Sequence, residues 1–200
     1  MQPTVELTRW PGAREARPSE RLALVLPGRG YTVQLPGLHL PLRALALQGW
    51  QVWTATWSGV GEVGDTETVR DLVVHACERF VQQVGRVPDL VLAKSMGTLA
   101  AGWVADHAVP AIWTTPLLHQ QDCVRDLARS TAPALLVGGS QDPAWDDSAA
   151  RLTGLPSVVV PGADHSWETG DWRAELAGLE RLCGAVEEFA ASLAETTPTQ

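Results

Sequence analysis

The sequence predicts an α/β protein, a three-layer sandwich in which a mostly parallel, doubly wound sheet of about six or seven strands carries helices on both faces. Three observations lead to this fold class. Short apolar runs alternate along the chain with longer segments of helical periodicity. Several of the short runs are continuously apolar, as expected for strands that are covered on both faces. The chain has 200 residues, enough to bury about 70% of its unfolded surface in one core.

Seven runs have the length and composition of strands. In chain order they are Thr4–Thr8, which has the weakest pattern, Arg21–Leu26, Gln51–Trp57, Leu90–Ala93, Ala111–Thr114, Ala134–Val137 and Ser157–Val160. Parallel neighbours in a sheet need a crossover connection, so the alternation of strands with helices demands a mostly parallel sheet. In such sheets ligands bind outside the carboxyl ends of the strands. The residues just after each run are therefore the candidates for function.

Two segments between or after these runs have a clear apolar stripe at helical spacing. Its members are Val69, Val73, Phe80 and Val84 in the first segment and Leu176, Leu179, Cys183, Val186, Phe189 and Leu193 in the second. The segment from Pro116 to Ala132 has room for only one short helix.

We expect one domain over residues 1–194 and a flexible C-terminal tail over residues 195–200, where the sequence ETTPTQ is polar. No internal repeat, low-complexity tract or linker interrupts the domain. The first residues lack the basic and apolar regions of a signal peptide, and no apolar run approaches the ~20 residues that a membrane span needs. A cytoplasmic protein with no membrane partner is the expectation.

Charge and cysteine usage exclude further classes of partner. The formal net charge is −8 without any basic stripe, so we expect no nucleic-acid partner. The three cysteines are odd in number and widely separated, which favours neither a disulfide framework nor a zinc site. His39, His75, His107 and His119 show no pairing at metal-ligand spacing. We expect neither a metal nor an organic cofactor.

The fourth strand run leads into Ala93-Lys94-Ser95-Met96-Gly97, which fits the Gly-x-Ser-x-Gly pattern with alanine in the first position. That pattern marks a nucleophile elbow, a strained strand-to-helix turn that exposes the serine hydroxyl. The turn needs small residues two before and two after the serine, because neighbouring backbone passes close by. Ala93 and Gly97 meet this need. Taken alone, the pentapeptide also fits an ordinary strand–loop–helix junction with an incidental serine.

Two later strand runs end in turns that carry an acid and a histidine. Asp142 lies in the turn after Ala134–Val137, and His165 lies in the turn after Ser157–Val160. The chain order Ser95, Asp142, His165, with each residue just past a strand, is that of a catalytic triad on this type of sheet. The three together are much rarer by chance than any one of them.

Three other acids lie near these turns and remain alternatives to Asp142. Asp146 and Asp147 lie one turn further on, where a solvated helix start is expected, and Asp164 directly precedes His165. A neighbour in sequence seldom reaches the imidazole with suitable geometry. Asp142 is therefore the preferred acid.

The second strand run is followed by Pro27-Gly28-Arg29-Gly30. Glycines there let the turn approach a bound carbonyl group closely. We predict an oxyanion hole formed by the backbone N–H groups of Met96, which follows the serine, and of Arg29. The same glycines also fit a turn that only closes a βα unit.

Four residues are candidates for the substrate pocket because they adjoin the predicted site. They are Gly28, Tyr31, Trp145 and Trp167, and for both tryptophans packing alone is the alternative. Arg29 and Lys94, the only lysine, could attract an anionic substrate. For these two cations we expect solvated charges at the edge of the sheet.

Residues 59–64 read Gly-x-Gly-x-x-Gly between a strand and a helix, which is also the fingerprint of a dinucleotide site. Such a site requires an acid near the end of the next strand, to hold the ribose. That strand ends at Ala93-Lys94-Ser95 instead. We interpret these glycines as a turn.

With these motifs in place, the sequence from Arg21 to about Leu193 resembles the α/β-hydrolase superfamily, in particular small esterases similar to dienelactone hydrolases and short-chain carboxylesterases. The resemblance implies Ser95 as nucleophile, His165 as base and Asp142 as the acid that orients the base. Many relatives insert a helical lid where this chain has only the short segment from Pro116 to Ala132, so the resemblance also implies an open site without a lid domain. Two departures are Ala93 in place of the usual glycine and Pro27 in place of the histidine often found before the oxyanion glycine.

This resemblance leads to an expected function. A serine esterase of this kind would cleave a small carboxylic ester or thioester, with that small molecule as its partner, through an acyl-enzyme intermediate. The superfamily carries many chemistries on one scaffold, so two alternatives stay open. One is a catalytically silent ligand-binding or interaction protein on the same fold, and the other is a related acyl transferase or C–C bond hydrolase.

Overall fold

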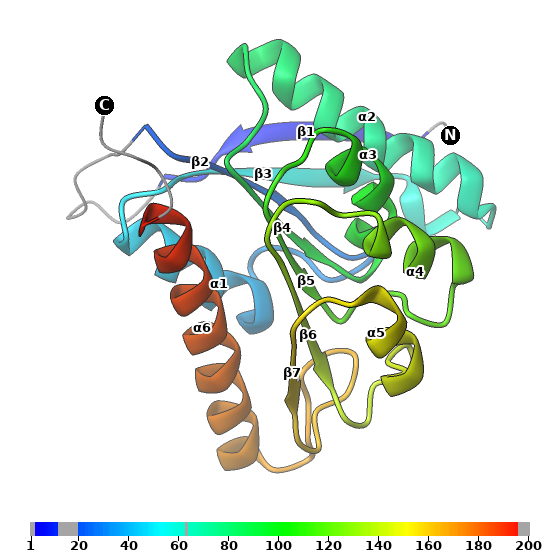
Figure 1. The fold of residues 1–200 in the computed structure, drawn as a ribbon, viewed down its shortest axis with the longest axis vertical. Coiled ribbons are helices and arrows are strands. Elements are labelled where there is room, and N and C mark those ends of the chain that lie inside the picture. The colour runs from blue at the N-terminus through cyan, green and yellow to red at the C-terminus, as the bar shows by residue number, and fades with distance from the viewer. Residues whose placement is uncertain (1–2, 12–19, 63, 196–200) are drawn as a thin grey trace.

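The computed structural model describes residues 3–11, 20–62 and 64–195, and in these ranges a 7-stranded sheet has the order β1-β3-β2-β4-β5-β6-β7 (Figure 1). The strands are β1 (Thr4–Arg9), β2 (Leu22–Leu26), β3 (Gln51–Ser58), β4 (Leu90–Lys94), β5 (Ala111–Thr114), β6 (Ala134–Gly139) and β7 (Ser157–Val160). All the predicted strands are therefore confirmed. The helices are α1 (Pro36–Leu47), α2 (Thr66–Val84), α3 (Ala101–Asp106), α4 (Gln121–Ala128), α5 (Asp147–Thr153) and α6 (Trp172–Glu195), with short 3-10 helices η1 (Val60–Glu62) and η2 (Ser95–Ala100).

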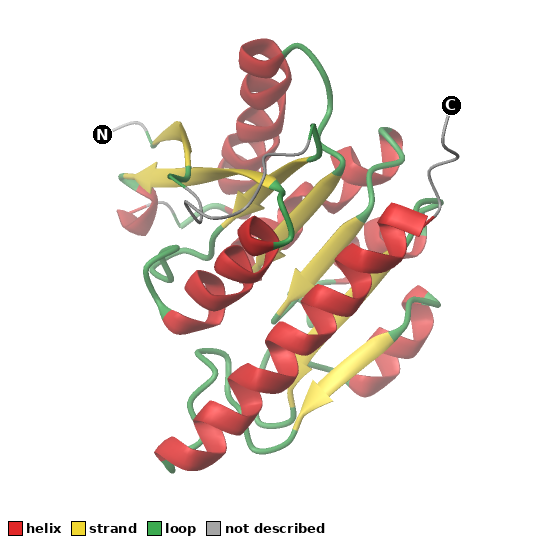
Figure 2. Ribbon diagram, turned by 90° about the vertical axis from the view of Figure 1, so that its left-hand side faces the viewer, coloured by secondary structure: helices red, strands yellow, loops and turns green. Residues whose placement is uncertain are grey.

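Helices cover both faces of this sheet. Figures 1 and 2 show α1 and α6 together on one face and α2, α3, α4 and α5 on the other. All residues of β2 are buried, and they alternate between two cores. Leu24 and Leu26 belong to the core under α2, whereas Ala23 and Val25 belong to the core under α1 and α6. The three-layer sandwich predicted from the sequence is confirmed.

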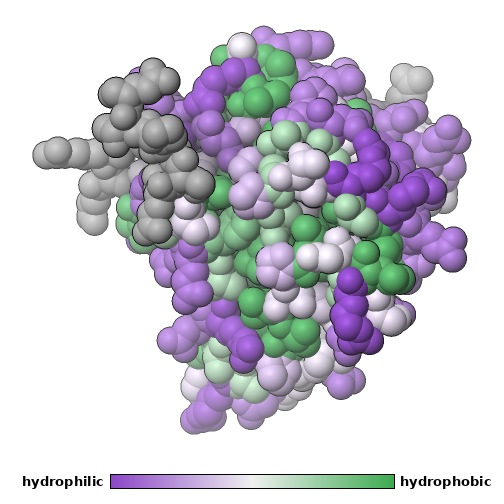
Figure 3. All heavy atoms as spheres, viewed as in Figure 1, coloured by the Kyte–Doolittle hydropathy of each residue, from purple (hydrophilic) through white to green (hydrophobic). Residues whose placement is uncertain are grey.

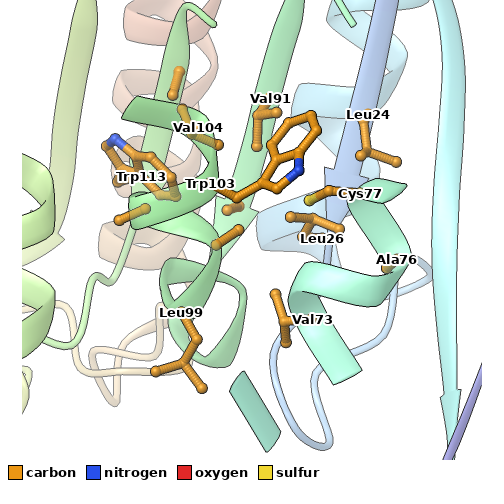
Figure 4. Packing of buried hydrophobic residues seen from close by; sticks show 14 of the residues in the cluster. Leu24, Leu26, Val73, Ala76, Cys77, Val91, Leu99, Trp103, Val104 and Trp113 are labelled. Atoms are coloured by element: carbon orange, nitrogen blue, oxygen red, sulfur yellow. The ribbon is translucent and has the colours of Figure 1, made fainter. Parts of the chain in front are cut away.

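The larger core lies between the sheet and the α2 layer. Figure 4 shows Cys77 of α2 near Leu24 and Leu26 of β2, and Val73 of α2 and Trp103 of α3 belong to the same cluster. Fully burying an apolar side chain of this size stabilises the folded state by about 1.5–3 kcal/mol. This packing holds the helices at fixed positions on the sheet, and so fixes the loops at its edge.

The sheet is parallel except for β1, which pairs antiparallel with β3. The strand order reverses at β2, because β3 lies on one side of it and β4 on the other. The connection from β2 to β3 runs through α1 on one face, and the connection from β3 to β4 runs through α2 on the other (Figure 1). The carboxyl ends of β2 and β4 therefore border the crevice in which such sheets bind ligands.

The segment in which a lid domain would be inserted is short. After β5 the chain forms α4 and then enters β6, with no further helix between them. At the C-terminal end, α6 extends to Glu195, which is one residue into the expected tail, and residues 196–200 lie outside the described residues. The fold has no lid, as the sequence predicts.

The outer surface reflects this layering. Figure 3 shows hydrophobic residues in the middle of one face of the molecule, between the two helical layers, and hydrophilic residues along its flanks. Helices with one apolar stripe turn their polar sides outward in this way. Within the described ranges, no helix has both the length and the apolar character required to cross a membrane.

Candidate active site

The chain turns sharply at Ser95, directly after β4. Ser95 has φ +51°, in the left-handed region that side chains other than glycine rarely adopt. The segment after it is the 3-10 helix η2, and the α-helix α3 begins only at Ala101. Backbone strain of this kind persists where the surrounding structure enforces it, and it is concentrated at functional sites.

Close backbone contacts explain the small residues around Ser95. A Cβ atom added to Gly97 would lie 2.4 Å from the carbonyl oxygen of Leu26 and 3.1 Å from the Cβ of Ala93. A larger residue at position 97 would push η2 away from β2. The Ala-x-Ser-x-Gly pattern thus has a direct physical cause, and alanine at position 93 fits the turn.

The structure brings Ser95, Asp142 and His165 together at the carboxyl edge of the sheet. The Nε2 atom of His165 lies 2.7 Å from Ser95 Oγ, and its Nδ1 atom lies 2.8 Å from Asp142 Oδ1. A carboxylate only accepts hydrogen bonds, so the imidazole carries its proton on Nδ1 and can accept from the serine hydroxyl through Nε2. The side chain of Asp142 is fully buried, whereas that of His165 is partly exposed.

Contacts between two adjacent loops hold the acid and the histidine in place. Beyond the β6–β7 pair, Ser140 N donates to the carbonyl of Val160 at 3.0 Å, and Ser140 Oγ accepts from Gly162 N at 2.8 Å. A Cβ atom added to Gly139 would lie 2.1 Å from the carbonyl oxygen of Ala163. The two loops are thus in direct contact, although they are separated in the sequence by α5 and β7.

The alternative acids are engaged elsewhere. Asp146 caps α5 by accepting from Ser148 N and Ala149 N, and Asp147 accepts from Trp145 Nε1 at 2.7 Å. Asp164 accepts from Ser166 N at 2.7 Å and Glu168 N at 2.9 Å. Among the described acids that could orient His165, Asp142 is the one in contact with the ring.

The loop after β2 adjoins the serine. A Cβ atom added to Gly28 would lie 3.3 Å from the Cβ of Ser95, and the carbonyl of Pro27 accepts from Trp57 Nε1 at 3.1 Å. Gly30 has φ +141°, a conformation that favours glycine. The loop therefore approaches the nucleophile as expected, and donation by the N–H groups of Arg29 and Met96 to an oxyanion stays a prediction.

A cavity of about 300 Å³ lies beside this loop. Its lining residues are Pro27, Gly28, Arg29, Gly30, Thr32, Val33, Gln34, Ala55, Thr56, Trp57, Gly59, Val60 and Gly61. Two glycines of the Gly-x-Gly-x-x-Gly pattern, Gly59 and Gly61, thus form part of a cavity wall. The sequence did not predict this role, because the wall forms only when residues 59–61 fold against residues 27–34.

The two tryptophans proposed for the pocket have different positions. Trp145 packs its ring on Gly138, where an added Cβ would lie 2.0 Å from Cε3, and it is partly buried against the larger core. Trp167 is only 3% exposed and packs against Gly37. Trp167 and Tyr31 also line a second cavity of about 270 Å³ beside the histidine loop.

The prediction that Lys94 carries a solvated charge at the edge of the sheet is wrong. We expected a solvated charge, but Lys94 is 0% exposed. Its Nζ donates to Thr115 Oγ1 at 2.7 Å and to the His165 carbonyl at 2.5 Å, and it lies 4.4 Å from the centroid of the Tyr31 ring. Burial lowers the pKa of Lys94 to about 8, while the charges of Asp142 and Asp164 oppose this shift. By contrast, Arg29 is exposed, as expected.

The signal for Lys94 was present in the sequence but ambiguous. The residue ends a continuously buried strand and directly precedes the serine. A lysine at a strand end usually extends its charged group into water. Its partners here come from loops 21 and 71 residues further along the chain, so local sequence did not indicate them.

Comparison with known proteins gives structural neighbours only. No protein-family model and no curated protein matches the sequence. An α/β serine hydrolase homologue from Coxiella burnetii is 20% identical, with a TM-score of 0.66 and 90% of each chain covered. A serine hydrolase without a lid from Xanthomonas campestris is 17% identical, with a TM-score of 0.71 over 98% of this chain and 91% of that chain.

A third neighbour is Est1E from Butyrivibrio proteoclasticus, in a structure with bound ferulic acid. It is 15% identical and has a TM-score of 0.73, with 97% of this chain and 96% of that chain covered. Identities in this range establish a shared fold, and an activity has to be argued from the site itself. The chain therefore adopts the α/β-hydrolase fold, in the form that lacks a lid.

Proposed function

We propose that the protein is a serine hydrolase that cleaves a small carboxylic ester or thioester through an acyl-enzyme intermediate. The observation that carries this proposal is the continuous hydrogen-bonded series from Ser95 Oγ through the His165 ring to Asp142 Oδ1. A serine hydroxyl is a weak nucleophile unless an adjacent base takes its proton. Here the base is within reach and is itself oriented by a buried carboxylate.

The reaction follows from this arrangement. His165 Nε2 takes the hydroxyl proton as Ser95 Oγ attacks the carbonyl carbon, and the protonated ring then donates that proton to the leaving alcohol or thiol. Asp142 holds the Nδ1–H tautomer and stabilises the imidazolium that forms. Water deprotonated by His165 hydrolyses the acyl-enzyme and releases the acid, which restores Ser95.

The oxyanion that develops on the substrate carbonyl requires hydrogen-bond donors close to Ser95, where the loop after β2 lies. The backbone N–H groups of Met96 and Arg29 are our assignment for these donors. Loss of one such donor typically costs about 2.7–4 kcal/mol of barrier. The proximity of Gly28 to Ser95 supports this assignment, because it leaves no side chain between the loop and the reacting carbonyl.

The cavity beside Gly28 is our candidate for the acyl group. Val33, Ala55 and Val60 contribute apolar wall, and the volume of about 300 Å³ suits a small or extended acyl chain. The absence of a lid leaves the leaving-group side open. The esterase named among the structural neighbours, which binds ferulic acid, is in keeping with ester chemistry on this fold.

A fluorophosphonate probe, which phosphonylates activated serines, tests the proposal. The wild type should label within minutes and hydrolyse p-nitrophenyl and thioester substrates, whereas Ser95→Ala should do neither. Ser157→Ala is the matched control, since Ser157 is exposed at the start of β7 and lies away from the carboxyl edge. Equal labelling of Ser95→Ala and wild type would refute the mechanism. An unlabelled wild type with no turnover would point to a silent binding protein.

A further inference from the structure

A buried lysine links the strand of the nucleophile to the loop of the base. We propose that Lys94 is a positioning residue, whose ammonium group holds the backbone carbonyl of His165 and so fixes the imidazole between Ser95 and Asp142. This inference rests on the proposed serine-hydrolase function and extends it to a residue outside the triad. Lys94 is not required to touch the substrate.

The contacts of Lys94 define this role. The residue ends β4, immediately before Ser95, and its Nζ donates to the carbonyl of His165 at 2.5 Å. Lys94 Nζ also donates to Thr115 Oγ1 at 2.7 Å, and Thr115 lies directly after β5. One ammonium group thus joins the carboxyl ends of two neighbouring strands to the loop after β7. The backbone of His165 is thereby fixed relative to the serine.

Fold stability alone gives no reason to place a charge here. Transfer of an ammonium group from water into a protein interior is costly, and apolar residues of similar volume often replace buried ions without loss of stability. Lys94 is nevertheless 0% exposed. Its charge is offset by the face of the Tyr31 ring at 4.4 Å, by the ring of Trp167 at 6.0 Å and by the nearby carboxylate of Asp142. The environment is specific to a cation.

The backbone around this ammonium group is strained. Ser95, Thr115 and Trp167 have φ values of +51°, +43° and +72°, and Ala108 is the other non-glycine residue with positive φ in the described ranges. Such conformations persist only where surrounding contacts enforce them. Three of these strained residues adjoin Lys94, as its neighbour in sequence, its hydrogen-bond partner or the ring beside its ammonium group. The contacts of Lys94 therefore hold a tightly constrained site together.

Substitution by methionine separates positioning from folding. Lys94→Met keeps most of the apolar stem and removes the donors, so we expect an unchanged or higher melting temperature. We also expect kcat for p-nitrophenyl ester hydrolysis to fall by roughly 100-fold, because a displacement of about 1 Å can cost that much, with KM nearly unchanged. Thr98→Val is the matched control, since Thr98 is buried in η2 and its hydroxyl has no hydrogen-bond partner among the described residues, and the kcat of this variant should stay near that of the wild type.

A second measurement does not depend on turnover. Imidazole ¹⁵N resonances of His165, identified by their loss in His165→Ala, should report one fixed Nδ1–H tautomer in the wild type and exchange between tautomers in Lys94→Met. If Lys94→Met fails to fold, Lys94→Leu carries both measurements, because its side chain also lacks a donor.

The outcomes distinguish this inference from the proposed function. Unchanged kcat and unchanged His165 resonances in Lys94→Met, with an active wild type and an inactive Ser95→Ala, would overturn the inference and leave the hydrolase proposal standing. A joint fall of melting temperature and kcat, without any change in the His165 resonances, would make Lys94 structural and would also overturn it. If the wild type neither labels nor hydrolyses esters, the proposed function fails, and the resonances alone decide whether Lys94 positions His165.

Discussion

A Cβ atom on Gly97 would lie 2.4 Å from the carbonyl oxygen of Leu26, closer than real Cβ atoms approach other heavy atoms. The two residues belong to η2 and β2, so this contact sets the distance between the nucleophile turn and the neighbouring strand. Ser95 lies two residues before Gly97 and has a left-handed backbone, a conformation that persists only where surrounding contacts enforce it. A change at Gly97 is therefore expected to shift the serine hydroxyl.

Gly97→Ala should consequently destabilise the protein and impair the site together. Overpacking of a tight contact typically costs about 1–3 kcal/mol, and a shifted Ser95 should lower fluorophosphonate labelling. Urea denaturation and labelling rates measure the two effects. Gly184→Ala is the control, because nothing lies within 4 Å of an added Cβ there, and this α6 variant should be neutral or slightly more stable. Wild-type behaviour of Gly97→Ala would contradict the steric argument.

Asp142→Asn should leave the fold intact and remove most of the activity. An asparagine amide can donate to Nδ1, which favours the wrong imidazole tautomer, and the corresponding change in a Ser-His-Asp triad lowers kcat about 10⁴-fold. Steady-state kinetics with a p-nitrophenyl ester measures this loss. Asp146→Asn is the matched variant, since Asp146 caps α5 and asparagine caps a helix equally well. Equal activities of the two variants would exclude Asp142 as the orienting acid.

The strands could be predicted from the sequence because burial on both faces leaves a local signature. In β2 the residues from Leu22 to Leu26 are all buried, and the sequence there is continuously apolar. The placement of Asp142 and His165 at the edge followed from the same rule, since each lies just past a parallel strand. Elements that depend on the nearest few residues could therefore be predicted from the sequence.

Features that depend on contacts between residues far apart in the sequence could not be predicted in this way. The local sequence around Lys94 is typical of a solvated strand end. In the structure, however, its ammonium group donates to Thr115 and to the backbone carbonyl of His165. Gly59 and Gly61 have the local pattern of a turn, and they form a cavity wall because the loop after β2 folds against them. Sequence patterns describe neighbours along the chain, whereas these roles arise from neighbours in space.

The stability of the protein should depend on pH through Lys94. Its folded pKa is about 8 against an ordinary value of 10.5, so between these limits the unfolded state binds more protons than the folded state. The contribution of Lys94 to the free energy of unfolding therefore rises with pH from about 8 to about 10.5. Asp142, Asp164, His165 and Tyr31 face this group, and burial raises the pKa of Tyr31, which keeps the phenol neutral through most of this range.

Denaturation at several pH values checks this dependence against a variant without the amine. The difference in unfolding free energy between wild type and Lys94→Met should shift in favour of the wild type as pH rises above about 8. The other titrating groups are common to both proteins, so their contributions largely cancel. Parallel curves for the two proteins would mean that Lys94 titrates normally in the folded state.

Gly61→Val should shorten the acyl chain that the enzyme accepts. Gly61 lines the cavity beside Gly28, and nothing lies within 4 Å of a Cβ added there, so the new side chain can enter the cavity without strain. Loss of space for one or two methylenes should lower kcat/KM for long-chain p-nitrophenyl esters by roughly tenfold or more, while the acetate ester is hydrolysed as before. Gly64→Val, in the same glycine pattern but with no part in this cavity, should leave the chain-length profile unchanged. If both variants retain the wild-type profile, the acyl group binds elsewhere.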